Sequence, residues 1–436
     1  METKQKPRVL VTTVGAWSSL NGSDTMSSLI MEYGAENVAA LYIRAEKSDS
    51  PAASRYFHII EGRVLQSILY RNIVTGEMFT PENVQVANID DDQAAEQSRY
   101  SYFKKHRSYI YVFAREFVWI LGKWKSQELK SFLDDFRPDV LVCPIESYIH
   151  FNTINEYIID YCHPKVLGFL WDDNFTYKQA PGNIGHQIHR FWLRKSVRRM
   201  VSKCYKVFSL SPKMKEECDV TFGINSQVLT KPIFNQGVFI PYTPSCPIRI
   251  LYTGKLIIGR DKTIMEIVSA IQEINREGTR AYLDIYTDTG LDDKTLARIQ
   301  VAGCCTLHDP IPQSEVFKRQ AEADVLLFAE SLSDRNLTAR LSFSTKLTDY
   351  FSAGKCIWAV GHTDLGPIDY LRREDAGLLS VSIQEIFSTL QRMVEDRSLI
   401  SDYAQKAYRC GVKNHSKEKI LKTFYDAIIE PVEEIR

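Results

Sequence analysis

The residues of this chain best suited to chemistry are Lys346 and Asp349, which lie one helical turn apart at the start of a predicted helix. That helix would end at Gly354 and lead into an apolar strand at 356–360. The N-terminus of a helix attracts anions, because its backbone N–H groups are free and its dipole is positive there. A lysine at this place can add a charge for a phosphate, and the carboxylate can accept hydrogen bonds from sugar hydroxyls. The segment 342–361 therefore predicts a site for the diphosphate and ribose of a nucleotide.

A second cationic loop follows a predicted strand at 248–253. Gly254 ends this strand and would let a ligand approach the backbone where a side chain would block it. Three bases come next, Lys255, Arg260 and Lys262. Alone, such a loop is as easily a solvated surface as a phosphate site. Because ligands bind at the carboxyl ends of parallel strands, the two loops together favour a diphosphate site.

The elements that would position these loops alternate between strand and helix, which is typical of an open α/β sheet. Strands are also expected in the N-terminal half at 8–14, 37–43, 138–143, 166–171 and 205–210. The stretch 55–135 is predicted to be mostly helical. Residues 232–247 are rich in Pro, Asn, Gly and Thr and are predicted to form a linker.

The predicted fold class is therefore α/β, with two Rossmann-like, doubly wound parallel-sheet domains. The expected boundaries are 1–240 for the N-terminal domain and 248–415 for the C-terminal domain. A last helix within 416–436 is expected to pack back on the N-terminal domain.

Composition narrows the class of protein. The 436 residues are 44% hydrophobic and 25% charged, which is ordinary for a soluble protein of two domains. Basic and acidic residues number 54 each, so the global charge says nothing about a nucleic-acid partner, and any basic patch must be local. No nucleic-acid partner is expected. The 9 cysteines include no Cys-x-x-Cys pair, which favours a reduced, cytoplasmic compartment. No secretory signal and no apolar run of about 20 residues occurs, so a soluble protein is expected.

Polar residues also follow two strands of the N-terminal half. Glu146 and His150 come after the strand at 138–143, and Asp172 comes after the strand at 166–171. At these strand ends the three residues are candidates for catalytic contacts with an acceptor. The alternative is that Glu146 and Asp172 cap helices and that His150 makes an ordinary polar contact.

The C-terminal half resembles the donor-binding domain of the GT-B glycosyltransferases, of the retaining family 4 or group 1 type. The resemblance spans about residues 248–415. It rests on the motifs Tyr252-Thr-Gly-Lys, Gln313-Ser-Glu-Val-Phe, Ala323-Asp-Val-Leu-Leu-Phe, Ser344-Thr-Lys-Leu-Thr-Asp-Tyr-Phe-Ser-Ala-Gly-Lys, Gly366-Pro-Ile-Asp-Tyr-Leu and Ala376-Gly. It implies two Rossmann-like domains that face a cleft. Many members read Ser-Lys-x-x-Glu-Tyr-x-Ala-Gly-Lys, so Asp349 stands where their ribose-binding Glu is expected.

By this resemblance the donor diphosphate would be held by Lys255 and by a base of the Arg260–Lys262 group, beside Gly254. Asp349 would bind the ribose, and the backbone near His308 would face the nucleobase. The pocket for phosphate and sugar would be lined by Ser344, Thr345 and Lys346. No metal and no cofactor is expected, because the bases and the helix dipole would neutralise the leaving diphosphate. One departure is Leu341, which replaces a second acid of the family motif.

The implied function is that of a hexosyl- or related glycosyltransferase. It would move a sugar, with retention and without metal, from a nucleotide diphosphate sugar to a hydroxyl of a glycan or lipid-linked glycan. The setting would be bacterial-type surface polysaccharide biosynthesis. Two alternatives stay open: a nucleotide-sugar epimerase of the same fold, and a non-catalytic GT-B-like binding subunit, for which the missing acid at Leu341 is an argument.

The segment 186–206 contains seven Lys or Arg residues and no acid. An apolar stripe at helical spacing is formed by Leu193, Val197, Met200, Val201 and Cys204. Such a helix can lie on an anionic membrane surface, which would place the protein peripherally at the inner face of the plasma membrane. The alternative is an ordinary helix that covers a sheet and exposes a basic face to solvent.

Overall fold

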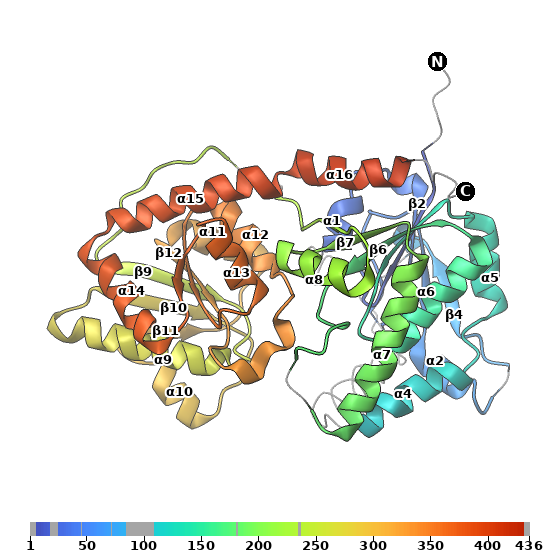
Figure 1. The fold of residues 1–436 in the computed structure, drawn as a ribbon, viewed down its shortest axis with the longest axis horizontal. Coiled ribbons are helices and arrows are strands. Elements are labelled where there is room, and N and C mark those ends of the chain that lie inside the picture. The colour runs from blue at the N-terminus through green and yellow to red at the C-terminus, as the bar shows by residue number, and fades with distance from the viewer. Residues whose placement is uncertain are drawn as a thin grey trace, which may run out of the picture. The chain divides into compact units, whose positions relative to one another are not determined.

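The computed structural model of the chain describes residues 6–17, 25–44, 46–70, 72–83, 109–179, 182–233 and 237–430 (Figure 1). The chain divides into two compact units. Unit 1 comprises the chain up to Leu210, Lys215–Leu229 and the segment from Leu421 onward, and unit 2 comprises Ser211–Met214 and Thr230–Ile420. Each unit is built around its own sheet.

The sheet of unit 1 has the strand order β4-β3-β2-β1-β5-β6-β7-β8. Neighbouring strands are parallel except for the β3–β4 pair, which is antiparallel. The central strands are almost wholly apolar and buried, as expected for strands covered on both faces. The strands are β1 (Val9–Thr13), β2 (Val38–Tyr42), β3 (Arg55–Ile59), β4 (Gly76–Phe79), β5 (Val140–Pro144), β6 (Lys165–Leu170), β7 (Lys206–Ser209) and β8 (Gln227–Val228).

Helices and short 3₁₀ turns connect these strands. The helices are α1 (Thr25–Ile30), α2 (Glu61–Gln66), α4 (Tyr109–Leu121), α5 (Gln127–Phe136), α6 (Ile149–Cys162), α7 (Ile184–Lys203), α8 (Pro212–Phe222) and α16 (Lys417–Ile429). From Leu421 onward α16 packs on unit 1, where the Phe424 ring lies 6.1 Å from that of Phe169 and 6.4 Å from that of Phe208. Local signals set several helix starts; for example, Asn183 accepts a hydrogen bond from the His186 N–H and caps α7.

The sheet of unit 2 has the order β11-β10-β9-β12-β13-β14 and is parallel throughout. Its strands are β9 (Ile248–Thr253), β10 (Ala281–Tyr286), β11 (Cys305–His308), β12 (Val325–Ala329), β13 (Cys356–Val360) and β14 (Leu378–Ser380). Its helices are α9 (Arg260–Ile274), α10 (Asp293–Ile299), α11 (Gln313–Glu322), α12 (Thr345–Ala353), α13 (Gly366–Arg373), α14 (Ile383–Glu395) and α15 (Ser398–His415).

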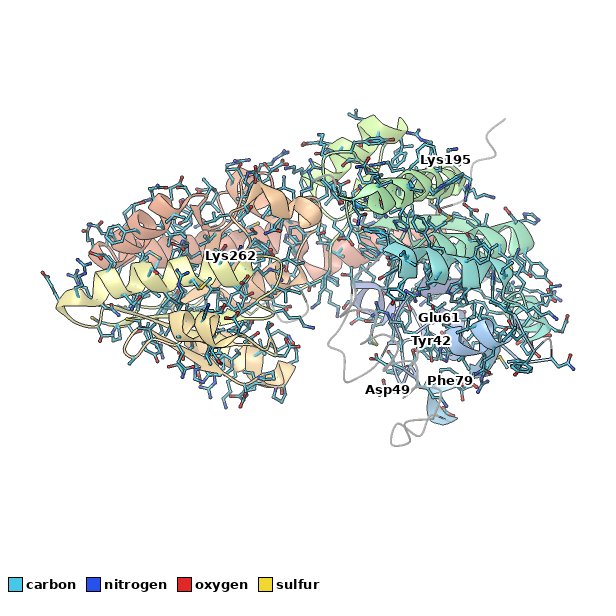
Figure 2. The ribbon with its side chains drawn as sticks, turned by 90° about the horizontal axis from the view of Figure 1, so that it is seen from below. Tyr42, Asp49, Glu61, Phe79, Lys195 and Lys262 are labelled. Carbon is cyan, nitrogen blue, oxygen red and sulfur yellow. The ribbon has the colours of Figure 1, made fainter. Side chains whose placement is uncertain are left out.

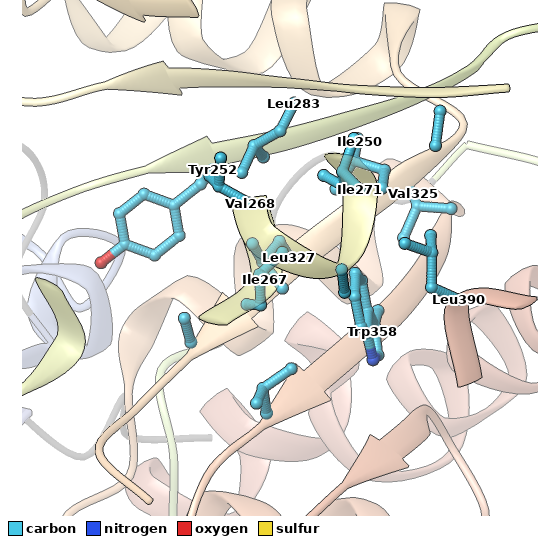
Figure 3. Close-up of a cluster of buried hydrophobic side chains, with 14 of the residues drawn as sticks. Ile250, Tyr252, Ile267, Val268, Ile271, Leu283, Val325, Leu327, Trp358 and Leu390 are labelled. Carbon is cyan, nitrogen blue, oxygen red and sulfur yellow. The ribbon is translucent and has the colours of Figure 1, made fainter. Parts of the chain in front are cut away.

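The core of unit 2 lies between this sheet and helices α9 and α14 (Figure 3). Alternate residues of the strands, such as Ile250 and Leu327, face side chains of the two helices, such as Ile267 and Leu390. Trp358 is fully buried in this cluster, and its indole N–H donates to Ser380 Oγ at 3.0 Å. This packing fixes the strand ends from which the basic loops leave the sheet.

The predicted fold class is confirmed, since two α/β units with largely parallel sheets are observed. The helical prediction for 55–135 is wrong in part, because β3 and β4 lie within this stretch. Both strands are short, at five and four residues, so they give little periodic signal in the sequence. Residues 84–108 of this stretch lie outside the described residues.

Candidate functional site

The strand order of unit 2 reverses direction between β9 and β12, which are neighbours in the sheet. In open parallel sheets ligands bind outside the carboxyl ends of the strands at such a switch point. Two segments leave the sheet there, the loop 254–259 after β9 and the segment that starts at Glu330 after β12. The first of the two is the basic loop that the sequence predicts to be a diphosphate site.

Lys346 lies directly over the backbone of this loop. A Cβ atom added at Gly254 would collide with Lys346 Nζ and lie 2.7 Å from its Cε, so a larger residue would displace the end of the lysine side chain. The φ of 137° at this position also favours glycine. The ammonium group also sits 4.6 Å from the centre of the Tyr252 ring. Burial, and then the nearby Arg260, lower the pKa of Lys346 to about 8. The structure thus brings Lys346 together with Gly254 and Arg260, which belong to a segment far from it in the sequence.

The Arg260 guanidinium makes two hydrogen bonds to the Glu330 carboxylate, at 2.9 and 2.7 Å. Their side chains are 19% and 11% exposed, so the pair is largely shielded from water. Lys346, in contrast, has no ion-pair partner among the residues that the structure describes. The cluster of Lys346, Arg260 and Glu330 therefore carries one uncompensated positive charge in a poorly solvated place, which is costly unless an anion binds there.

The backbone of the loop is strained next to this cluster. Ile258 has φ 58° and Gly259 has φ 81°, and a left-handed conformation is a genuine outlier for a β-branched residue such as Ile258. A Cβ atom at Gly259 would lie 2.5 Å from Asn336 Nδ2 and 2.8 Å from Ser331 Oγ, so the segment after β12 closes tightly on the loop. The two segments therefore pack against each other at the switch point.

Asp349 lies on α12 one turn after Lys346 and pairs with a residue that the sequence did not point to. Lys231 Nζ is 3.2 Å from Asp349 Oδ1, and the two side chains are 10% and 17% exposed. Burial raises the pKa of Asp349, and Lys231 opposes this shift. A ligand that uses this carboxylate would therefore share it with Lys231.

The other predicted donor residues lie around this centre. Ser344 is the N-cap of α12 and Thr345 its first residue. Lys255 pairs with Asp288 at 3.4 Å, and Lys262 is exposed on α9 (Figure 2). His308 ends β11, where its Nε2 lies 2.7 Å from Asp284 Oδ1 and its ring stacks on Tyr286 at 4.5 Å. No hydrogen bond joins Lys255, Lys262 or His308 to Lys346 in the described part of the chain.

Leu341, the position at which the family motif has an acid, is fully buried in unit 2. The carboxylate nearest to the basic centre is instead Glu330, at the end of β12. Sequence reasoning missed Glu330, although an acid directly after an apolar strand is the kind of signal that marks a strand-end site.

In unit 1 the strand order reverses between β1 and β5, and Glu146 follows β5 at this point. Its loop is held by Asn152, whose side chain bonds the Glu146 N–H and carbonyl at 2.9 and 3.0 Å. Burial, and then the charge of Asp172, raise the pKa of Glu146 to about 7. The structure therefore brings the predicted Glu146 and Asp172 into one electrostatic environment.

His150 is placed differently from Glu146. Its ring is buried in the first turn of α6, stacks on Trp119 at 5.0 Å and lies with Nδ1 3.0 Å from Glu116 Oε1. The same carboxylate accepts hydrogen bonds from the N–H groups of Ile149 and His150 and so caps the helix. These contacts hold the ring inside unit 1.

We expect Glu146→Gln to stabilise the protein at alkaline pH and to have little effect near pH 5. The folded pKa of about 7 lies above the value of about 4.5 in the unfolded chain. The wild-type protein therefore loses stability as pH rises from about 4.5 through 7, because Glu146 ionises in a place that disfavours its charge. Gln stays neutral over the same range. Chemical unfolding at pH 8 should show a gain of about 1–2 kcal/mol in the free energy of unfolding. Glu277 is exposed, so Glu277→Gln serves as the control. A gain in the free energy of unfolding that does not change with pH would contradict the prediction.

Among the described residues, no helix is long and apolar enough to cross a membrane. Within the same ranges, no group of three or more His, Cys, Asp or Glu side chains is arranged to hold a metal ion.

Comparison with known proteins gives similarity at the level of structure. No family model and no curated protein matches the sequence. Anabaena HepE, solved in complex with UDP, aligns with a TM-score of 0.62 at 10% identity, over 97% of this chain and 100% of that chain. Sucrose-phosphate synthase from Thermosynechococcus elongatus aligns with a TM-score of 0.61 at 12% identity, over 96% of this chain and 97% of that chain.

A third similar structure is the lipopolysaccharide outer core galactosyltransferase WaaB, with a TM-score of 0.57 at 15% identity, over 97% of this chain and 99% of that chain. The alignments run through both units and span almost the whole of each protein. At these identities the similarity is one of fold. The chain has the GT-B architecture of these glycosyltransferases.

Proposed function

We propose that the chain is a glycosyltransferase that takes a sugar from a UDP-sugar and binds the donor diphosphate with Lys346 and Arg260. The observation that carries this proposal is the partly buried Lys346, whose ammonium lies over Gly254 at the switch point without a carboxylate partner in the described ranges. A diphosphate would supply the missing negative charge. HepE, a protein of similar fold, is described in complex with UDP and with UDP-glucose, which supports uracil as the donor base.

The same groups suit the chemistry of the donor. When the bond between the sugar C1 and the phosphate oxygen breaks, its electron pair stays on the leaving diphosphate. Lys346 and Arg260 are fixed before the reaction and would stabilise this developing charge, which is the most effective form of electrostatic catalysis. No metal ion is needed for this step. We propose that the acceptor hydroxyl attacks C1 on the face that the diphosphate leaves and passes its proton to the leaving phosphate, so the sugar configuration is retained.

We assign the acceptor to unit 1, with Glu146 and Asp172 as the groups that hold its hydroxyls. Glu146, with its pKa of about 7, can donate a hydrogen bond when protonated and accept one when ionised. The proposed acceptor is a glycan or a lipid-linked glycan of surface polysaccharide biosynthesis. WaaB, whose fold is similar, is described as a galactosyltransferase of the lipopolysaccharide outer core.

A thermal-shift screen tests the donor assignment. UDP, GDP, ADP and CMP would each be added with and without EDTA, because a ligand that binds only the folded protein raises its melting temperature. We expect UDP to stabilise most, by about 2.7 kcal/mol at a concentration 100 times its Kd, and EDTA to leave this shift unchanged. No shift with any nucleotide would overturn the proposal.

Measurements of turnover distinguish a glycosyltransferase from an epimerase and from a non-catalytic binding subunit. NMR of a UDP-sugar with the protein alone would reveal an epimerase, because the donor sugar would change configuration without release of UDP. UDP release that depends on an acceptor glycan supports transfer, and the anomeric signal of the product reports retention. Binding of UDP without any turnover over a panel of acceptors would favour a binding subunit.

A further inference from the structure

Helix α7 carries two apolar faces, and only one of them is buried against the parts of unit 1 that the structure describes. The predicted stripe is the buried face: Leu193, Val197, Met200 and Val201 all lie in the core of unit 1. A second apolar set, which we call the α7 ridge, consists of Ile184, Ile188, Phe191 and Trp192. These side chains are 76%, 47%, 47% and 52% exposed. Their spacing places them together on one side of the helix.

Cations follow the α7 ridge along the same helix. Lys195 is exposed and lies 4.9 Å from the centre of the Phe191 ring and 5.1 Å from that of Trp192 (Figure 2). Arg194 covers the exposed Tyr177 ring at 3.4 Å, and Arg198 donates to the Thr221 carbonyl. None of these three bases has a carboxylate partner among the described residues. Arg199 and Lys203 differ, since they pair with Glu156 and Asp160 on α6.

Helix α4 adds a second exposed apolar row beside the start of α7. Ile110, Phe117 and Leu121 lie at helical spacing and are 76%, 59% and 51% exposed. The two helices meet at their first turns, where the Tyr109 ring lies 5.3 Å from that of His186. The two charged residues of α4 are paired within unit 1 and so do not interrupt the row: Arg115 with Glu61 and Glu116 with His150.

We propose that the α7 ridge and the cations behind it dock on an anionic lipid bilayer, with α7 lying in the headgroup region. Aliphatic and aromatic side chains gain by leaving water, and Trp and Phe are well suited to the boundary between headgroups and acyl chains. Lys195, Arg194 and Arg198 would face lipid phosphates, and α7 contains no acidic residue that would be repelled. The proposal uses residues other than the donor site and does not depend on the proposed function.

Vesicle flotation tests this proposal with the full chain. We expect the wild type to float with vesicles of phosphatidylcholine containing 30% phosphatidylglycerol, and to float little with phosphatidylcholine alone. Ile188→Glu combined with Trp192→Glu should abolish flotation. Lys195→Glu should lower partitioning about fivefold or more, because each basic residue near an anionic surface contributes about 1 kcal/mol. As a matched control, Ile383→Glu changes an exposed isoleucine at the start of α14 in unit 2 and should float like the wild type.

Fluorescence locates the contact. Brominated lipids should quench tryptophan emission of the wild type, and Trp192→Phe should remove most of this quenching while it keeps flotation. Circular dichroism and a cooperative thermal unfolding transition show whether each variant is folded. Failure of the folded wild type to float, or flotation of the double variant at the wild-type level, would overturn the proposal. So would a dimer in ultracentrifugation that the double variant dissociates without any vesicle binding, because the ridge would then join two copies of the chain.

Discussion

Replacing Lys346 by Met is expected to weaken UDP binding by about 100-fold or more while it makes the ligand-free protein more stable. The loss of affinity follows from the charge-assisted contacts between an ammonium group and phosphate oxygens, each of which contributes about 1.5–3 kcal/mol. Titration calorimetry with UDP measures it. Lys262→Met is the matched control, because Lys262 is an exposed lysine of the neighbouring helix α9 and should lose little affinity.

The gain in stability has a separate cause. The Lys346 pKa of about 8 lies below its usual value of 10.5, so the fold penalises the charged form. This penalty is complete below pH 8 and disappears as pH rises towards 10.5. Methionine fills a similar volume without a charge, so the free energy of unfolding should rise by about 1–2 kcal/mol at pH 7 and approach the wild-type value near pH 10. Unchanged UDP affinity in Lys346→Met would contradict the diphosphate assignment, whatever happens to the stability.

Sequence pattern predicted the sheet of unit 2 well, because its strands are buried on both faces and appear as short apolar runs between loops. The same reasoning located Gly254 and Lys346, since each stands next to a strand end or a helix start. It could not place Lys346 over Gly254, because that contact depends on β9 and β12 being neighbours in the sheet. Strand order is set by the packing of the whole unit, and the local pattern does not record it.

The ion-pair partners of the charged residues could not be predicted from the sequence either. Lys231 is 118 positions from Asp349, and no spacing rule links the two. Glu330 lies outside the family motif, whose acid corresponds to the position of Leu341. In α7 the sequence shows two apolar sets, but only the packing of unit 1 decides that Leu193 faces the core and Trp192 the solvent.

The Lys231–Asp349 pair gives the second large expected effect. Asp349→Asn would leave the Lys231 ammonium, which is 10% exposed, without a carboxylate, and removal of one partner of a buried pair is strongly destabilising. We expect the free energy of unfolding to fall by about 3 kcal/mol. Lys231→Met should be destabilising by less, because the Asp349 carboxyl can take up a proton and become neutral. The double variant should recover most of the loss, since it leaves no buried charge; a strictly additive double variant would mean that the two groups do not interact.

The same variants decide whether Asp349 also contacts the ribose. Lys231 Nζ bonds only Oδ1 among the described residues, so the second oxygen of the carboxylate can accept from a ribose hydroxyl. If it does, Asp349→Asn should weaken the binding of UDP by about tenfold or more, because a charged acceptor is lost. The binding of inorganic pyrophosphate should not change, because that ligand has no ribose. Competition titrations with both ligands, in the folded double variant as well as the single one, separate this effect from lost stability. An equal loss of affinity for UDP and for pyrophosphate would instead place Asp349 at the phosphates. No loss of affinity for either ligand would show that Asp349 is not part of the donor site.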